Sequence, residues 1–145
     1  MTKIYLAGPM SGIPQFNFPA FFAAAERLRA DGFEVVSPAE IDHEDDKGAA
    51  LSSPDGDPTN RVAMNNKSWG DFLARDVKLI AESGIEGIVF LPGWEKSKGA
   101  KLEAFVALLT HKDFKFYRFT NFGAIVVTPY DIAASIFHEI KESIR

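Results

Sequence analysis

The order of apolar runs and amphipathic stretches is the feature that most constrains the fold of this chain. Residues 4–7 form a short apolar run that ends at a Gly-Pro pair, and residues 33–36 form a second run. Between them, residues 18–31 carry apolar side chains at the spacing of one helix face, and Gly32 follows as a natural helix end. A strand, a helix and a strand in this order predict a βαβ unit, which winds right-handed.

The same alternation continues through the second half of the chain. Ser68 and Asp71 have the spacing of a capping box, which predicts a helix that begins there and ends at Gly84. The sequence further predicts strands at 87–92, 114–119 and 124–127, a helix at 100–110 and a last helix that opens at 128–131. Strands that alternate with helices imply a mostly parallel sheet covered on both faces. We therefore expect one domain over residues 1–145, a flavodoxin-like (Rossmann-like) α/β sandwich whose five strands lie in the order 2-1-3-4-5.

Residues 39–67 differ in character from the rest of the chain. They contain a charged run at 42–47 and a turn-rich run at 52–58. A stretch of this length without regular structure is usually functional or mobile, so we expect either a mobile surface insertion or an active-site lid. The charged run lacks the D-x-D-x-D-G spacing of a calcium loop, and no metal is expected.

The composition excludes several classes of function. The chain has no cysteine, which excludes a disulfide framework, a thiolate nucleophile and a cysteine-ligated metal. Its formal net charge of −4 leaves no basic surplus for non-specific nucleic-acid binding. No apolar run approaches the roughly 20 residues of a transmembrane helix, and the N-terminus does not resemble a signal peptide. We therefore expect a cytoplasmic protein that binds neither nucleic acid nor membrane.

Two loops are expected to meet where an open α/β sheet binds its ligands, beyond the carboxyl ends of strands one and three. The second loop, at 93–99, leads into a helix N-terminus, which favours an anion such as phosphate. Ser97 would then be either a phosphate ligand or an ordinary helix cap. The sequence has neither a Walker A motif nor a G-x-G-x-x-G motif. The first loop comprises Gly8, Pro9, Met10, Ser11 and Gly12.

Two carboxylates stand in otherwise apolar helix surroundings. Glu103 lies one turn into a predicted helix, and its spacing fits either a solvent-facing residue or a functional one. Asp76 follows Arg75 and could form half of a surface ion pair. If both acids reach the same edge of the sheet, they match glycosidic chemistry, which needs one nucleophile or base and one acid. Tyr5 is either a core residue or a hydroxyl that orients a carboxylate.

Three segments carry a resemblance to a known family. Residues 4–9 (Ile-Tyr-Leu-Ala-Gly-Pro), the Arg75-Asp76 pair and residues 97–104 (Ser-Lys-Gly-Ala-Lys-Leu-Glu-Ala) resemble the nucleoside 2-deoxyribosyltransferase superfamily. This superfamily includes 2'-deoxynucleoside 5'-monophosphate N-glycosidases. The resemblance implies a flavodoxin-like fold, a homodimer or higher homo-oligomer, and cleavage of an N-glycosidic bond without any cofactor.

The resemblance also implies roles for individual residues. Glu103 would attack the anomeric carbon, Tyr5 would orient Glu103, and Asp76 would handle the proton of the nucleobase. Ser97 matches the phosphate-binding serine of the nucleotide hydrolases. The expected substrate contacts are Gly8, Pro9, Met10, Ser11, Gly12, Trp94, Ser97, Gly99 and, from a neighbouring subunit, Asn121.

The expected activity is cleavage of a nucleoside or (deoxy)nucleoside 5'-monophosphate through a covalent glycosyl-Glu103 intermediate, with transfer to water or to another nucleobase. Two alternatives remain open at this point. One is a phosphoribohydrolase that acts on ribonucleotides, because no residue visibly tests the 2' position of the sugar. The other is a non-catalytic module that binds and sequesters a nucleotide.

Overall fold

Five strands form one sheet in the order β2-β1-β3-β4-β5. In the computed structural model, which describes residues 2–41, 44–82, 84–120, 123–127, 138, 141 and 142, the first four of these strands run parallel. The last is antiparallel to β4, because only two residues separate the two strands and a parallel crossover needs many more. The mostly parallel flavodoxin-like order predicted from the sequence is confirmed. The strands are β1 (Lys3–Ala7), β2 (Glu34–Val36), β3 (Gly87–Phe90), β4 (Asp113–Thr120) and β5 (Gly123–Val127).

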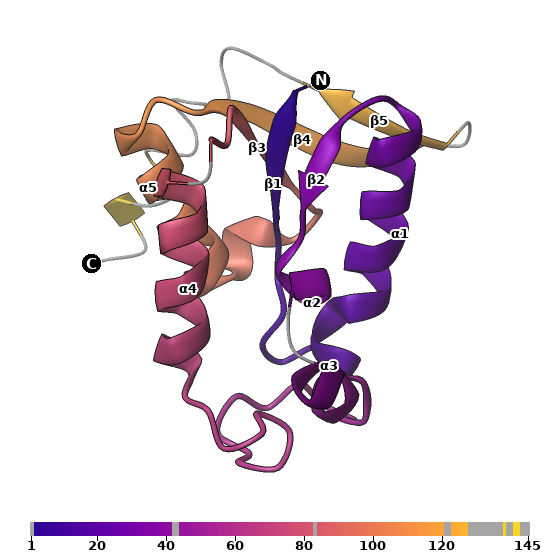
Figure 1. The fold of residues 1–145 in the computed structure, drawn as a ribbon, viewed down its shortest axis with the longest axis vertical. Coiled ribbons are helices and arrows are strands. Elements are labelled where there is room, and N and C mark those ends of the chain that lie inside the picture. Colours follow the sequence, from indigo (N-terminus) through magenta and orange to yellow (C-terminus); the bar gives the residue numbers. More distant parts are fainter. Residues whose placement is uncertain are drawn as a thin grey trace.

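Helices lie on both sides of this sheet (Figure 1). Helix α1 covers one side, and α4 and α5 pack against each other on the other side. The two-residue alternation of β1 decides which side chain faces which layer: Ile4 and Leu6 join the core beneath α1, whereas Tyr5 joins the core beneath α5. The helices are α1 (Phe18–Ala30), α2 (Pro38–Ile41), α3 (Glu44–Leu51), α4 (Trp69–Glu82) and α5 (Lys98–Leu109), with short 3-10 turns η1 (Pro14–Asn17) and η2 (Trp94–Lys96).

Local capping signals fix the start of α4. The Ser68 hydroxyl accepts from the Asp71 amide at 3.1 Å, and the Asp71 carboxylate accepts from the Ser68 amide at 2.8 Å. This reciprocal pair is the capping box that the sequence predicts, and it satisfies two donors at the helix end. The cap therefore fixes where α4 begins, directly before Trp69.

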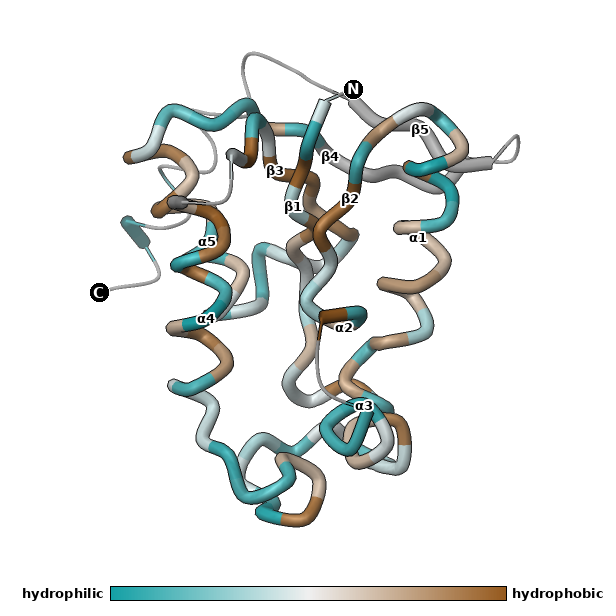
Figure 2. Tube along the Cα trace, viewed as in Figure 1, coloured by the Kyte–Doolittle hydropathy of each residue, from teal (hydrophilic) through white to brown (hydrophobic). Residues whose placement is uncertain are grey.

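The segment 39–67 is more structured than the sequence suggested. We expected a long stretch without regular structure; instead, α2 and α3 occupy its first part, and turns occupy the rest. The Gly12 amide donates to the Gly56 carbonyl oxygen, and the Gln15 amide donates to that of Ser53, both at 2.8 Å. These backbone bonds attach the segment to the loop that follows β1. Figure 2 shows hydrophobic colour on the central strands and mostly hydrophilic colour on these turns.

The last predicted helix, which opens at 128–131, lies outside the described residues, and so does Asn121. No helix within the described part of the chain is long and apolar enough to cross a membrane.

Candidate active site

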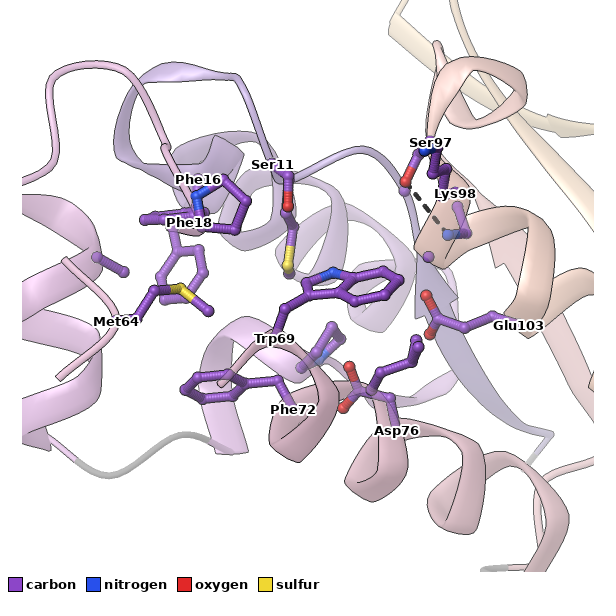
Figure 3. Close-up of a pocket in the computed structure, with 18 of the residues that line it drawn as sticks. Ser11, Phe16, Phe18, Met64, Trp69, Phe72, Asp76, Ser97, Lys98 and Glu103 are labelled. Atoms are coloured by element: carbon purple, nitrogen blue, oxygen red, sulfur yellow. Dashed lines mark hydrogen bonds between the residues drawn. The ribbon is translucent and has the colours of Figure 1, made fainter. Parts of the chain in front are cut away.

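A cavity of about 490 Å³ opens beyond the carboxyl ends of β1 and β3, where the fold places ligands. Figure 3 shows acidic side chains on one side of this cavity and an apolar wall on the other, with Trp69 between them. The acidic side comes from α4 and α5, and the apolar wall comes from η1, the segment that precedes α4 and the first turn of α4. The described residues that line the cavity include Gly8, Met10, Ser11, Phe16, Phe18, Asp46, Ala50, Ala63, Met64, Trp69, Phe72, Arg75, Asp76, Ser97, Gly99 and Glu103.

Glu103 and Asp76 are both buried, with 6% and 8% of their surfaces exposed. Glu103 lies on the face of α5 that also buries Ala100, Ala104 and Ala107, and this face packs toward α4 and the sheet. Figure 3 shows both carboxyl groups directed into the cavity. Of the two interpretations that spacing left open for Glu103, the solvent-facing one is therefore excluded.

Asp76 forms an ion pair with its neighbour Arg75. The Arg75 guanidinium donates to Asp76 Oδ1 from Nε at 2.9 Å and from one terminal nitrogen at 2.8 Å. The guanidinium also lies over the Phe72 ring, 5.5 Å from its centroid. The sequence allowed a surface ion pair here, but the Asp76 side chain is only 12% exposed. This ion pair therefore places a carboxylate at the cavity.

Burial raises the pKa of Glu103 well above its ordinary value, and the negative charge of Asp76 raises it further. Tyr5 and Arg75 act in the opposite direction, because each stabilises the charged form of Glu103. The two carboxyls therefore retain one proton at a higher pH than two isolated carboxyls would. Such a shared proton is what a pair with one acid and one nucleophile requires.

Tyr5 is fully buried beneath α5, and burial followed by the charge of Glu103 raises the pKa of its hydroxyl. The hydroxyl lies near enough to favour the Glu103 anion, yet the contact does not meet hydrogen-bond geometry. Within the described part of the chain, neither Tyr5 Oη nor Glu103 Oε2 has a hydrogen-bond partner. Buried polar atoms without partners cost free energy, so their persistence beside a cavity points to a functional role.

The raised pKa of Glu103 predicts a pH-dependent effect of Glu103→Gln on stability. Between the ordinary glutamate pKa and the raised one, the folded protein binds more protons than the unfolded chain, so wild-type stability falls as pH rises. Glutamine removes this slope. We expect urea unfolding to show the variant gaining stability over wild type by up to about 1.4 kcal/mol per pH unit above about pH 4.5.

Glu95→Gln is the matched control, because Glu95 is partly exposed on η2 and does not line the cavity. A difference between Glu103→Gln and wild type that stays constant from pH 4 to 8 would contradict the buried, proton-retaining state of Glu103.

The loop before α5 places Ser97 at the cavity and also at the helix end. Its hydroxyl accepts from the Ala100 amide at 3.2 Å, so it is the N-cap of α5. Gly99, the other predicted contact of this loop that lines the cavity, lies beside it. Trp94 instead packs against Phe90 in the core, with ring centroids 4.8 Å apart, and is not among the lining residues described.

The loop after β1 contributes Gly8, Met10 and Ser11 to the cavity. Gly8 is required by packing, because a Cβ atom there would lie 2.8 Å from the Leu91 Cβ atom. Pro9 and Gly12 do not line the cavity in the described structure. The Pro9 carbonyl accepts from the Asn17 side chain, and the Gly12 amide bonds to Gly56, so both hold the loop in place.

Sequence reasoning missed the whole apolar wall. Met64, Trp69 and Phe72 line the cavity, as do Asp46 and Ala50, which lie one turn apart on α3. The four-residue spacing of the last two was the only local signal that they share a face. Among the described residues, no group of three or more His, Cys, Asp or Glu side chains could hold a metal ion.

Comparison with known proteins identifies a family for this chain. No curated protein gives a significant match. The family described as "Domain of unknown function (DUF4406)" matches residues 2–116, a span that contains β1 to β3, the cavity and both buried acids. The chain therefore belongs to the DUF4406 family.

Proposed function

We propose that this protein cleaves the N-glycosidic bond of a nucleoside or (deoxy)nucleoside 5'-monophosphate. The observation that carries the proposal is the pair of buried acids, Glu103 and Asp76, which face one cavity from two helices, with Tyr5 beneath them. Glycosidic cleavage needs two carboxyl groups with opposite tasks in one site. The resemblance of residues 4–9, 75–76 and 97–104 to nucleoside 2-deoxyribosyltransferases supports the same chemistry.

In the proposed reaction, a Glu103 oxygen forms a bond to C1' of the sugar as the bond between C1' and the base nitrogen breaks. Asp76 donates a proton to the leaving base, which takes the electron pair of the broken bond. Water, or the nitrogen of a second base, then displaces Glu103 from C1', and Asp76 accepts the proton of that nucleophile. Tyr5 favours the Glu103 anion before the attack and after its release.

The raised pKa of Glu103 means that a proton has to leave Glu103 for this sequence of steps to proceed. Glu103 attacks only as an anion, whereas Asp76 acts as an acid only when protonated. The pair needs one proton in total, and burial favours its retention on Glu103. Positive charge that develops at C1' favours the Glu103 anion, so the proton shifts toward Asp76 and the base as the bond breaks.

A 5'-phosphate would lie at the N-terminus of α5. Backbone amides at a helix N-terminus bind anions, and Ser97 at this end lines the cavity. Lys96 and Lys98 also line the cavity and add positive charge. Because Ser97 caps the helix through its oxygen, its hydroxyl hydrogen is still able to point to a phosphate.

We expect Ser97→Ala to weaken monophosphate binding by roughly 1.5–3 kcal/mol and to leave nucleoside binding unchanged, because a hydrogen bond to a charged group is lost. Ser97→Asp should weaken monophosphates further by repulsion. Calorimetry with a deoxynucleoside and its 5'-monophosphate, at two salt concentrations, measures the affinity of each variant for each ligand. Ser52→Ala is the matched control, since Ser52 is exposed and does not line the cavity. If Ser97 is only a helix cap, the loss is about 1 kcal/mol of stability with no change in ligand preference.

The test of the function itself is a panel of ribo- and deoxyribonucleosides and their 5'-monophosphates, followed by chromatography for free base. Release of base from deoxynucleotides supports the proposal. Faster release from ribonucleotides favours the phosphoribohydrolase alternative. Tight binding with the nucleotide recovered intact would favour a sequestering module and would contradict cleavage.

A further inference from the structure

The proposed reaction fixes the direction in which the leaving base extends through the cavity. In that reaction the 5'-phosphate lies at Ser97, C1' lies at Glu103, and the base takes its proton from Asp76. Figure 3 shows these residues on one side of Trp69 and Phe16 on the other side. A base that is bonded to C1' and contacts Asp76 therefore extends past Trp69, and its edge away from the sugar points to the far part of the cavity.

This far part of the cavity, which we call the apolar section, is built from four segments of the chain. Its side chains are Phe16, Ala50, Ala63, Met64 and Phe72. The first four belong to one buried core cluster, and Phe72 packs against that cluster. Trp69 is 42% exposed, so its indole offers a flat surface between the apolar section and the acids (Figure 3). The apolar section thus continues the site in the direction of the base.

Asp46, one turn before Ala50 on α3, also lines the cavity, but its charge is engaged within its own part of the chain. Its Oδ1 accepts from the Asn65 side-chain amide at 2.7 Å, and its Oδ2 pairs with the Lys67 ammonium. Burying a carboxylate is costly unless it is paired, and these partners supply pairing. Asp46 therefore ties α3 to the residues before α4, and ligand recognition in this part is left to the apolar side chains.

Phe16 is held at the apolar section by an unusual backbone. Positions 15–17 form a run of left-handed residues, with φ of 58°, 51° and 63°. Such a run is costly for residues other than glycine, and it persists only where other contacts enforce it. Here the Asn17 side chain donates to the Pro9 carbonyl oxygen at 2.9 Å, and the Gln15 side chain donates to that of Leu51 at 3.1 Å. The fold thus accepts a strained turn that places an aromatic ring at the cavity.

Unmodified nucleobases match the apolar section poorly. Their edges away from the sugar carry ring nitrogens, amino groups or carbonyl oxygens, which need hydrogen-bond partners when they are buried. None of the described side chains of the apolar section carries an N–H or O–H group. A hydrocarbon substituent on the same edge instead gains from burial, by about fourfold in binding for each CH₂ group.

We propose that the leaving group is a nucleobase that carries an apolar substituent, an alkyl or aryl group, on its edge away from the sugar. This inference rests on the proposed function and names its substrate class. The base ring lies against Trp69, and the substituent fills the apolar section against Phe16 and Met64. Selection is by size and apolar surface, so a polar substituent of equal size is rejected.

A substrate series with one variable group tests the proposal. The series is the 5'-monophosphate of deoxyadenosine and its N6-methyl, N6-propyl and N6-(2-hydroxyethyl) derivatives. The propyl and hydroxyethyl groups have equal numbers of heavy atoms, so they differ in polarity and hardly in size. We expect kcat/KM of wild type to rise from the parent compound through methyl to propyl, by roughly tenfold to sixtyfold in all, and to fall back for the hydroxyethyl compound.

Filling the apolar section should remove this preference. Ala50→Leu adds as many carbon atoms to the wall as the propyl group adds to the base, so we expect the propyl-to-parent ratio of kcat/KM to fall to about one. Ala63→Leu, from a different segment, should do the same. Ala49→Leu is the matched control and should keep the wild-type ratio, because Ala49 is the neighbouring residue on α3 and does not line the cavity. Each ratio is measured within one protein, so a loss of folded protein lowers both substrates alike.

Calorimetry on Glu103→Gln with the same series measures the preference in binding without any cleavage. If wild type cleaves the propyl compound with no higher kcat/KM than the parent or the hydroxyethyl compound, this inference is overturned and the proposed function stands. A propyl preference that survives in both Ala50→Leu and Ala63→Leu also overturns it. A propyl preference in binding, with no base released by wild type, supports the apolar section and overturns the proposed function. Failure of every compound to bind overturns both.

Discussion

We expect Glu103→Gln to abolish the release of free base while the protein stays folded. A glutamine amide cannot form the ester bond to C1', so the covalent route is closed rather than slowed. Glutamine has nearly the shape of the protonated glutamic acid that burial favours, so the packing beneath α5 is preserved. The measurement is base release by chromatography, with circular dichroism to verify folding, and Glu95→Gln as the variant that should keep wild-type activity.

Mass spectrometry of the wild-type protein, mixed with substrate and quenched, provides the second readout. We expect a sugar adduct on the peptide that contains Glu103, and none in Glu103→Gln. An adduct on Asp76 would exchange the roles of the two acids. Base release by Glu103→Gln at a rate near that of wild type would rule out covalent catalysis by this residue.

Asp76→Asn should slow cleavage by about 10²–10⁴-fold for a substrate with a poor leaving group, the usual contribution of a general acid. A substrate whose base leaves readily without protonation should lose much less, and this pair of substrates is the internal control. The single-turnover rate of base release is the quantity to compare. Equal losses on both substrates would mean that Asp76 positions the base and does not protonate it.

The order of strands and helices could be predicted because the sequence signals for these elements are local. The apolar run at β1, the capping box at Ser68 and Asp71, and Gly32 after α1 each specify an element by its own sequence. Once strands and helices alternate, right-handed crossovers leave few possible strand orders. The antiparallel pairing of β5 follows equally simply from its short separation from β4.

The site could be predicted only in part, because burial depends on contacts distant in sequence. Spacing placed Glu103 near a helix start, but only the packing of α5 on α4 and β1 shows that it is buried beside Asp76 and above Tyr5. Trp94 resembled a loop contact and instead fills the core against Phe90.

The part of the cavity wall that comes from residues 46–64 gave even weaker signals in the sequence. These residues lie in a segment whose charge and turn residues are typical of a solvent-exposed loop. Asp46 meets Asn65 and Lys67 only after α3 and the following turns have folded back on each other.

Segment 39–67 is attached to the loop after β1 through its own main chain. Two main-chain bonds, to the carbonyl oxygens of Gly56 and Ser53, attach it to the loop after β1, and the Gln15 side-chain amide donates to the Leu51 carbonyl oxygen at 3.1 Å. Gly56 is restricted in identity, since a Cβ atom there would lie 2.1 Å from the Ile13 carbonyl oxygen. Because the acceptors at Leu51, Ser53 and Gly56 are all main-chain carbonyl oxygens, these attachments are kept when exposed side chains of the segment are replaced. Under the proposed function, point substitutions in this one short stretch of the gene would change the compound that is accepted while the two acids on α4 and α5 stay in place.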